Sequence, residues 1–160
     1  MFNEPQFRSL IVRPVLEHLQ NWSESAEELL ILTFAAESLG GTYLKQIEGP
    51  ALGGYCMEPD TYNYLWATWL PSHSHYAYKA LQAVYMSNKP PAEMLVDNIR
   101  YATIMARLNY CRFSEPLPAA SDIKSLAQYY KKYWNTEKGK ATVESAIISY
   151  NHFMGYKKTK

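Results

Sequence analysis

Apolar residues along this chain recur mainly at intervals of three and four positions, the spacing that places them on one face of an α-helix. No Asn-Gly or Asp-Gly pair separates alternating apolar and polar runs, so the pattern contains no strong signal for a β-hairpin. No repeat, low-complexity tract or long linker interrupts it. The sequence therefore predicts an all-α fold in one domain covering residues 1–160.

Start and stop signals divide this pattern into separate helices. Ser25 and Glu28 have the spacing of a capping box, and the pair Gly40-Gly41 is a helix stop. Pro14 is expected to kink the first helix or to start a second piece. We expect helices over residues 5–19, 25–39, 59–70, 73–87, from after Pro90-Pro91 to 111, from 121 or 122 to 133, and 142–153. Any strand is expected only as one short hairpin around residues 42–56, and the basic tail 155–160 should lie outside the helices.

The composition is that of a globular protein with an unusual number of large aromatic rings. Hydrophobic residues make up 48% of the chain and charged residues 19%, which excludes a disordered protein. The net charge of +1 argues against a protein that binds nucleic acid by neutralising phosphates. Tyrosine and tryptophan join an apolar body to a polar tip, so the 14 Tyr and 4 Trp suit both a helical core and a sugar-binding groove.

Neither a metal site nor a membrane segment is expected. Cys56 and Cys111 are too few for a disulfide framework, and no Cys-x-x-Cys or His-x-x-x-His spacing indicates zinc, so we expect no cofactor. Residues 1–14 lack the basic-then-apolar layout of a secretory signal peptide. The longest apolar stretch, residues 29–36, is too short to span a bilayer, so no membrane insertion is expected.

Among the carboxylates, Glu37 is distinguished by its place at the end of an apolar stripe. Leu30, Thr33, Phe34 and Glu37 fall at i, i+3, i+4 and i+7 of the expected second helix and so share one face. Burial and the negative end of the helix dipole both disfavour ionisation there, so we expect a raised pKa for Glu37. A general acid that works near neutral pH requires such a pKa. The pattern alone leaves open a solvated glutamate that simply ends a helix.

Two motifs around Glu37 resemble a known family. Residues 35–38 read Ala-Ala-Glu-Ser, and residues 49–59 read Gly-Pro-Ala-Leu-Gly-Gly-Tyr-Cys-Met-Glu-Pro. The order resembles the core of lytic transglycosylases and goose-type lysozymes, in which Glu-Ser at a helix end precedes a Gly-Ala-x-Gly-Leu-Met-Gln-like turn and a proline. Cys56 occupies the position of the family's Gln, at a separation of 19 from Glu37.

Two later stretches extend the resemblance, which covers residues 25–151. Residues 97–108 contain Asn98-Ile99 and are similar to the family's Asn-Ile helix beside the cleft. Residues 126–136 are similar to its Ala-Ala-Tyr-Asn element, which supplies a tyrosine near the acid. Together these stretches resemble the lysozyme-like domains of bacteriophage and prophage proteins.

The resemblance implies a peptidoglycan-cleaving muramidase or lytic transglycosylase of phage origin. Glu37 would be the general acid at the glycosidic bond between N-acetylmuramic acid and N-acetylglucosamine. The implied partners are glycan strands and other virion proteins, and the implied location is the virion or host cytoplasm, with delivery to the wall by lysis or injection machinery. The implied substrate-binding residues are Ser38, Gly53, Tyr55, Cys56, Asn98, Tyr101 and Tyr129, with Tyr130 and Tyr133 as alternatives to Tyr129.

Departures from the family pattern leave two questions open. Gly54-Tyr55-Cys56 stands in place of Leu-Met-Gln, and a thiol is a weaker hydrogen-bonding group than the amide it replaces. A lysozyme-like structural protein of a virion, with weak or no catalysis, is therefore the alternative function. Glu58 is a candidate second carboxylate, but an acid just before a helix is also explained by the helix dipole.

Overall fold

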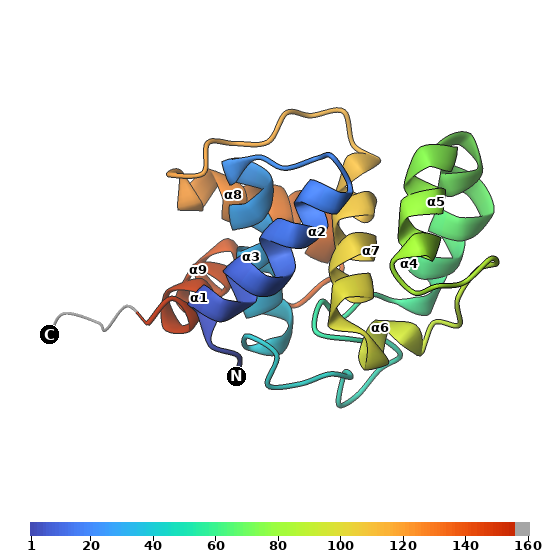
Figure 1. Cartoon of the computed structure of the whole chain (residues 1–160). Helices are drawn as coiled ribbons and strands as arrows, with labels where there is room; N and C mark the ends of the chain where they lie inside the picture. Colours follow the sequence, from blue (N-terminus) through green and yellow to red (C-terminus); the bar gives the residue numbers. More distant parts are fainter. Residues whose placement is uncertain (156–160) are drawn as a thin grey trace, which may run out of the picture.

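The computed structural model describes residues 1–155, and its regular structure is helical throughout (Figure 1). Within this range the structure has no β-strand, so the prediction of an all-α fold is confirmed. The predicted tail lies outside the described residues except for Gly155. The elements are α1 (Glu4–Phe7), η1 (Arg8–Val12), α2 (Arg13–His18), α3 (Glu24–Ser38), α4 (Pro59–Tyr64), η2 (Leu65–Trp69), η3 (Leu70–Ser72), α5 (Ser74–Gln82), α6 (Met94–Asp97), α7 (Ile99–Cys111), α8 (Ile123–Tyr130), η4 (Lys131–Asn135) and α9 (Val143–Phe153).

The first helix runs through Pro14 without a break by widening into a π-turn. In this turn, η1, the backbone N–H of Arg13 bonds to the carbonyl of Arg8, one residue further back than in an α-helix. Proline has no N–H to donate and its ring crowds the carbonyl four residues earlier. A π-turn at that place loosens the crowding, so α1, η1 and α2 form one continuous helix.

Helix α3 begins earlier than predicted because a different serine caps it. The side chain of Ser23 accepts a hydrogen bond from the backbone N–H of Ala26, and the helix starts at Glu24. The predicted capping box of Ser25 and Glu28 is therefore wrong. The predicted stop is present, since Leu39, Gly40 and Gly41 all adopt positive φ angles that turn the chain away from the helix axis.

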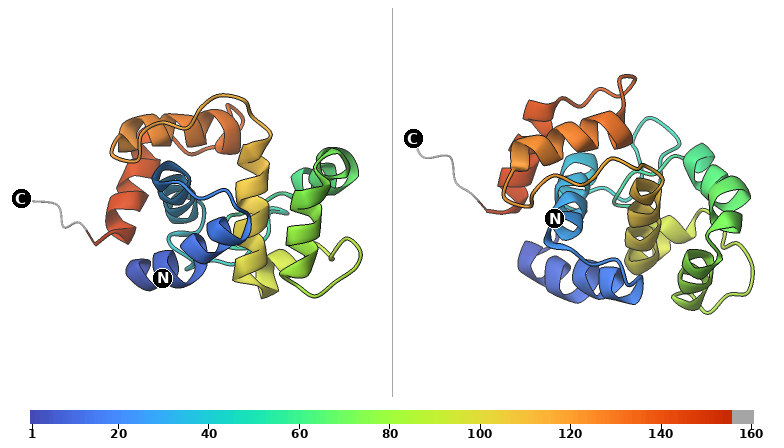
Figure 2. Two further views of the ribbon diagram at one scale, coloured as in Figure 1. Left: turned by 45° about the horizontal axis from the view of Figure 1, so that its top comes forward. Right: turned by 90° about the horizontal axis from the view of Figure 1, so that it is seen from above.

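Helix α3 lies at the centre of the fold and is buried on all sides for most of its length. Every residue from Leu29 to Ala35 is buried, which places apolar side chains around the whole helix rather than along one stripe. It packs most extensively against α9, and also against α8, α7 and η1 (Figure 2). Its C-terminal end, which carries Glu37, is thus held by several surrounding elements.

A charged network fastens the N-terminal helix to the start of α3. The guanidinium of Arg8 contacts Glu4, Glu27 and Glu28, and Arg13 binds Glu27 at 2.8 Å. Burial acts to raise the pKa of Glu27, but hydrogen bonds from Arg13, Trp22 and Arg8 hold it below its ordinary value. The network fixes the end of α3 opposite to Glu37.

The long helix predicted after Pro90-Pro91 is two helices, because Asn98 interrupts it. Asn98 has an extended backbone conformation, and its side-chain oxygen accepts a hydrogen bond of 3.0 Å from the N–H of Tyr101. This bond caps α7, so the chain ends α6 at Asp97 and starts again at Ile99.

Helices α4 and α5, with η2 and η3 between them, lie on the side of α7 away from α8 and α9 (Figures 1 and 2). A chain of hydrogen bonds connects them to α7. Trp66 Nε1 donates to the hydroxyl of Tyr101 at 3.1 Å, and that hydroxyl lies 2.7 Å from the hydroxyl of Tyr62. The Tyr62 hydroxyl in turn donates to the carbonyl of Pro90 at 2.6 Å.

Within residues 1–155, no helix combines the length and apolar content that crossing a bilayer requires.

The segment between α3 and α4 contains pairings but no strand. Isolated antiparallel bridges join Lys45 to Leu52 and Leu52 to Met57. Leu52 and Met57 exchange two backbone hydrogen bonds, at 2.9 and 3.0 Å. The segment predicted as a possible site of a short hairpin is thus a compact loop with strand-like contacts, and it leads the chain past Glu37.

Candidate active site

A cavity of about 530 Å³ lies at the C-terminal end of α3. Its walls come from the end of α3, the loop before α4, α4 itself, helix α7, the π-turn η4 and the segment that follows η4. The lining residues are Glu37, Gln46, Ala51, Cys56, Met57, Glu58, Thr61, Asn109, Trp134, Asn135, Thr136, Lys138, Gly139, Lys140 and Ala141. A cavity of this size admits a ligand as large as one or two sugar rings.

Glu37 is partly buried in this cavity, and its carboxyl is held in the protonated form up to near-neutral pH. Burial raises its pKa to about 7, the hydrogen bond from Tyr130 opposes the rise, and the nearby negative charge of Glu58 adds to it. The position at the end of α3 acts in the same direction through the helix dipole. A carboxyl with this pKa can donate a proton at neutral pH and can also accept one back.

Tyr130 fixes the orientation of the acid. Its hydroxyl donates a hydrogen bond of 2.6 Å to Oε1 of Glu37. Burial and the adjacent carboxylate both raise the pKa of Tyr130 well above its usual range, so the hydroxyl stays protonated and remains a donor. With Oε1 engaged in this way, Oε2 is left as the oxygen that can carry the proton towards a ligand.

Cys56 also lines the cavity and is tied to the backbone of α3. Its thiol donates a hydrogen bond of 3.3 Å to the main-chain carbonyl of Glu37. Burial, together with the charge of Glu37, raises the pKa of the thiol to about 12. A thiol that stays protonated in this way is a poor nucleophile, so its contact with α3 gives it a structural role in holding the loop against the acid.

Glu58 is the second carboxylate of the cavity. It precedes the first residue of α4, and its side chain makes no capping hydrogen bond to that helix. The side chain instead lines the cavity with Glu37 and influences it electrostatically.

Cys56 lines this cavity, but the other predicted substrate-binding residues do not, and all of them lie in the described part of the chain. Ser38 is buried, where its hydroxyl donates to the carbonyl of Phe34 at 3.0 Å and accepts from the N–H of Gly41 at 2.9 Å. Gly53 is buried against the backbone of Leu95, and a β-carbon placed there would lie 2.3 Å from the Leu95 carbonyl oxygen. In the structure both residues shape the chain around Glu37 rather than the cavity surface.

The remaining predicted residues have structural partners elsewhere. Tyr55 is buried with its hydroxyl 3.2 Å from Thr103 Oγ1. Tyr101 belongs to the hydrogen-bonded chain behind α7, and Asn98 caps that helix. Tyr129 is buried and donates to the carbonyl of Glu115 at 3.0 Å. The tyrosine beside the acid is its neighbour Tyr130, one of the two alternatives that the sequence offered.

Sequence reasoning assigned residues 126–136 to the element near the acid, but it named only tyrosines there and missed the other cavity residues of this wall. Helix α8 continues as the π-turn η4, which brings Trp134 and Asn135 to the cavity, and the following segment 136–141 completes the wall. It also missed Asn109, which lies on α7 one residue beyond the stretch 97–108 that resembles the family's Asn-Ile helix. Trp134 could have been included by extending the predicted helix beyond Tyr133, since the helical spacing continues there. Nothing in the sequence pattern distinguished Asn109.

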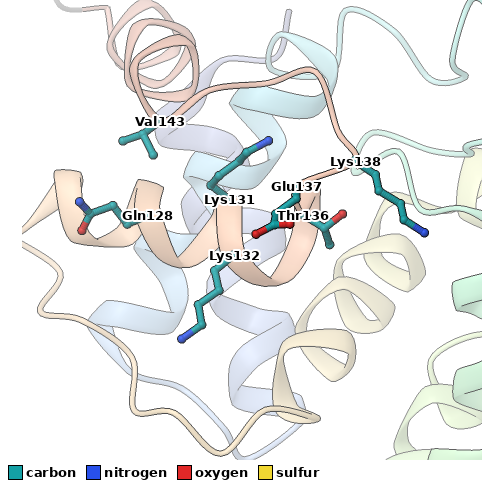
Figure 3. Close-up of a pocket in the computed structure, with 7 residues that line it drawn as sticks. All are labelled: Gln128, Lys131, Lys132, Thr136, Glu137, Lys138 and Val143. Atoms are coloured by element: carbon teal, nitrogen blue, oxygen red, sulfur yellow. The ribbon is translucent and has the colours of Figure 1, made fainter.

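A second hollow, of about 800 Å³, adjoins the first and shares Thr136 and Lys138 with it. It is more open and is lined by Gln128, Lys131, Lys132, Thr136, Glu137, Lys138 and Val143 (Figure 3). Lys131 and Lys132 point to opposite sides of the ribbon in Figure 3. Lys131 Nζ donates to Asn135 Oδ1 at 2.6 Å and to the carbonyl of Gly139 at 3.0 Å, so it supports the wall between the two hollows.

In the part of the chain that the structure describes, no group of three or more His, Cys, Asp or Glu side chains is arranged to hold a metal ion.

No protein-family model, no curated protein and no solved structure matches this chain.

Proposed function

We propose that this protein is a peptidoglycan-cleaving glycosidase, a muramidase or lytic transglycosylase of phage origin, with Glu37 as its general acid. One observation carries the proposal: a carboxyl at a helix end, in a cavity, with a pKa raised to about 7 and one oxygen fixed by Tyr130. Perturbed carboxyls of this kind concentrate at sites of acid catalysis. The Glu-Ser and Gly-Pro-Ala-Leu-Gly motifs around it support the same assignment.

In the proposed reaction, Glu37 donates its proton to the oxygen between N-acetylmuramic acid and N-acetylglucosamine. The bond between that oxygen and the anomeric carbon breaks, and the oxygen leaves as a hydroxyl. The acetamido group of the substrate stabilises the anomeric carbon. Glu37, now a carboxylate, then takes a proton from the attacking water or 6-hydroxyl, whose oxygen forms the new bond to that carbon. The raised pKa suits both halves of this cycle, because the group must be protonated first and basic afterwards.

A single acid is sufficient for this scheme, and Glu58 has an electrostatic role in it. Its charge keeps the proton on Glu37 at the start of the cycle. The two-carboxylate mechanism of most glycosidases would instead require Glu58 to act as a base or nucleophile. Replacing Glu58 separates these two schemes.

A structural protein of a virion with this fold is the second candidate function. The observation that favours it is the thiol of Cys56, which is bonded to the backbone of α3 and offers a substrate no amide. Such a protein would use the cavity as a surface for another chain and would not release sugar from cell walls.

Clearing of purified cell walls tests the proposal. We expect the wild-type protein to solubilise walls and Glu37→Gln to lose about a hundredfold or more in rate, as expected for loss of a general acid. Glu48→Gln is the matched control, because it makes the same change at an exposed position of the loop before α4. Clearing by neither wild type nor control, with both folded, would reject catalysis in favour of the structural function.

A further inference from the structure

Asn109 is a buried amide on the wall of the cavity. It lies on α7 and is only 4% exposed. Among the described residues, its Oδ1 is the single buried side-chain nitrogen or oxygen atom without a hydrogen-bond partner. Because nearly all buried polar groups in proteins are satisfied, an exception calls for an explanation.

The fold itself gives no reason for an amide at this position. The helix around Asn109 is apolar and buried, with Leu108 and Tyr110 in the core on either side. A leucine of similar size would avoid the cost of an unsatisfied acceptor in such surroundings. The partner that satisfies Asn109 therefore has to be sought outside the chain, and the cavity that it lines is the route by which one can arrive.

A carboxamide is a distinctive recognition group because it carries an acceptor and a donor side by side. Rotation about the last bond of its side chain exchanges their positions, so either atom can face the cavity. The ligand group that complements the carboxamide in either orientation is another amide, which has an N–H and a C=O of its own. A hydroxyl can form only one of these bonds at a time in good geometry.

The surroundings of Asn109 suit the apolar part of such a group as well. Trp134 lines the same cavity and packs on Tyr110, with the two ring centroids 5.2 Å apart. Met57 adds a second apolar surface to the cavity wall. The cavity thus joins a buried amide to apolar surfaces that can receive a methyl group or a sugar ring face.

We propose that Asn109 recognises the N-acyl group of the ligand that occupies this cavity. The inference rests on the proposed function, in which that ligand is a glycan and the N-acyl group is the acetamido group of a sugar. Asn109 is then a specificity residue: it favours an N-acetylated ring next to Glu37 over a ring that carries a hydroxyl at the same position. The cost of this selectivity is a buried acceptor that has no hydrogen-bond partner within the described residues.

Binding of two uncharged oligosaccharides tests the inference without requiring turnover. The probes are the tetramer of N-acetylglucosamine and cellotetraose, which has hydroxyl groups in place of the acetamido groups. Calorimetric titration uses Glu37→Gln protein, alone and combined with Asn109→Leu or with Asn63→Leu. Asn63 is an exposed residue of α4 away from the cavity and is the matched control.

We expect the Glu37→Gln protein to bind the acetylated tetramer about tenfold or more tightly than cellotetraose, in line with one or two lost hydrogen bonds. Asn109→Leu should abolish this preference, and Asn63→Leu should retain it. Asn109→Leu should also unfold at the same temperature as its parent or above it, because it removes a buried unsatisfied acceptor. Melting below the parent would contradict the view that the fold does not need this amide.

The result distinguishes this inference from the proposed function. If walls are cleared but Asn109→Leu keeps the full preference for the acetylated tetramer, the role of Asn109 is rejected while the glycosidase stands. If walls are not cleared but the preference exists and depends on Asn109, catalysis is rejected and acetamido recognition stands. Binding only by a peptide-bearing wall fragment, and not by the peptide-free tetramer, would assign the amide to peptide recognition and overturn the inference.

Discussion

The hydroxyl of Tyr130 lies 2.6 Å from Oε1 of Glu37 and joins two residues that are 93 positions apart in the chain. The bond connects the end of α8 to the end of α3, whose Glu37 lines the cavity. It also opposes the effect of burial on the acid, since it stabilises the carboxylate and lowers the pKa of Glu37. The proton affinity of Glu37 is thus set by a balance between burial, Tyr130 and Glu58.

This balance predicts opposite effects of two substitutions on the pH dependence of activity. Tyr130→Phe removes the bond that favours the carboxylate, so the pKa of Glu37 should rise and the alkaline limb of kcat/KM should move to higher pH. Glu58→Gln removes the negative charge that disfavours the carboxylate form of Glu37, so the pKa of Glu37 should fall and the alkaline limb should move to lower pH. The pH profile of wall solubilisation by the three proteins checks both directions.

If the alkaline limb moved in the same direction in Tyr130→Phe and in Glu58→Gln, the result would contradict this balance. A Glu58→Gln protein that is nearly inactive at every pH would indicate that Glu58 takes part in the chemistry. The two-carboxylate mechanism would then replace the single-acid one.

The raised pKa of Glu37 predicts a stability that falls as pH rises. In the unfolded chain this carboxyl ionises near its ordinary value of 4.5, whereas in the folded protein it ionises only near 7. Between these values the unfolded state has released the proton and the folded state still holds it, so the free energy of unfolding decreases with pH. Relative to Glu37→Gln, the wild type should lose about 2–3 kcal/mol between pH 4 and pH 8.

Urea unfolding of both proteins at several pH values measures this difference. Comparison with the glutamine variant cancels the contributions of other titrating groups. A difference between the two proteins that stays constant with pH would show that Glu37 has an ordinary pKa, and one that favours the wild type as pH rises would show a lowered pKa; either result would contradict the raised pKa.

A structural role for Gly53 predicts a cost of substitution that does not depend on any ligand. Its φ of +76° is unfavourable for other residues, and an added β-carbon would meet the carbonyl oxygen of Leu95. Gly53→Ala should therefore destabilise the protein by about 2 kcal/mol or more. Gly155→Ala is the matched control, because Gly155 has a φ of +74° but open space around it, and it should cost about 1 kcal/mol or less.

The free energy of unfolding of the two alanine variants separates backbone strain from steric contact. Equal costs at the two positions would mean that the contact with Leu95 adds nothing, and that strain alone requires glycine there.

Much of the helical framework could be predicted from the sequence, because it depends on local periodicity and on capping residues. The end of the second helix at Gly40-Gly41 and the place of Glu37 just before it follow from residues close together in the chain. The continuity of the first helix through Pro14 and the helix boundary at Asn98 were harder to predict. A π-turn absorbs the proline, and the cap at Asn98 interrupts a pattern that remains helical on both sides.

The composition of the cavity wall could not be predicted in the same way. Tyr129 and Tyr130 are adjacent on α8, and which of them faces Glu37 depends on how that helix is rotated against α3. Asn109 looks like an ordinary helix residue until its burial and its lack of a partner are known. Tyr55 and Tyr101 suited a sugar groove by composition, yet both are buried with hydrogen-bond partners in the core.

The most direct test of the central claim is mass analysis of the soluble material that wild type and Glu37→Gln release from purified cell walls. We expect wild type to release muropeptides cut between N-acetylmuramic acid and N-acetylglucosamine, either hydrolysed or lighter by one water as an anhydro ring. Glu37→Gln should release about a hundredfold less in the same time. Equal release by the two proteins would exclude Glu37 as the acid, and no release by folded wild type would contradict the glycosidase.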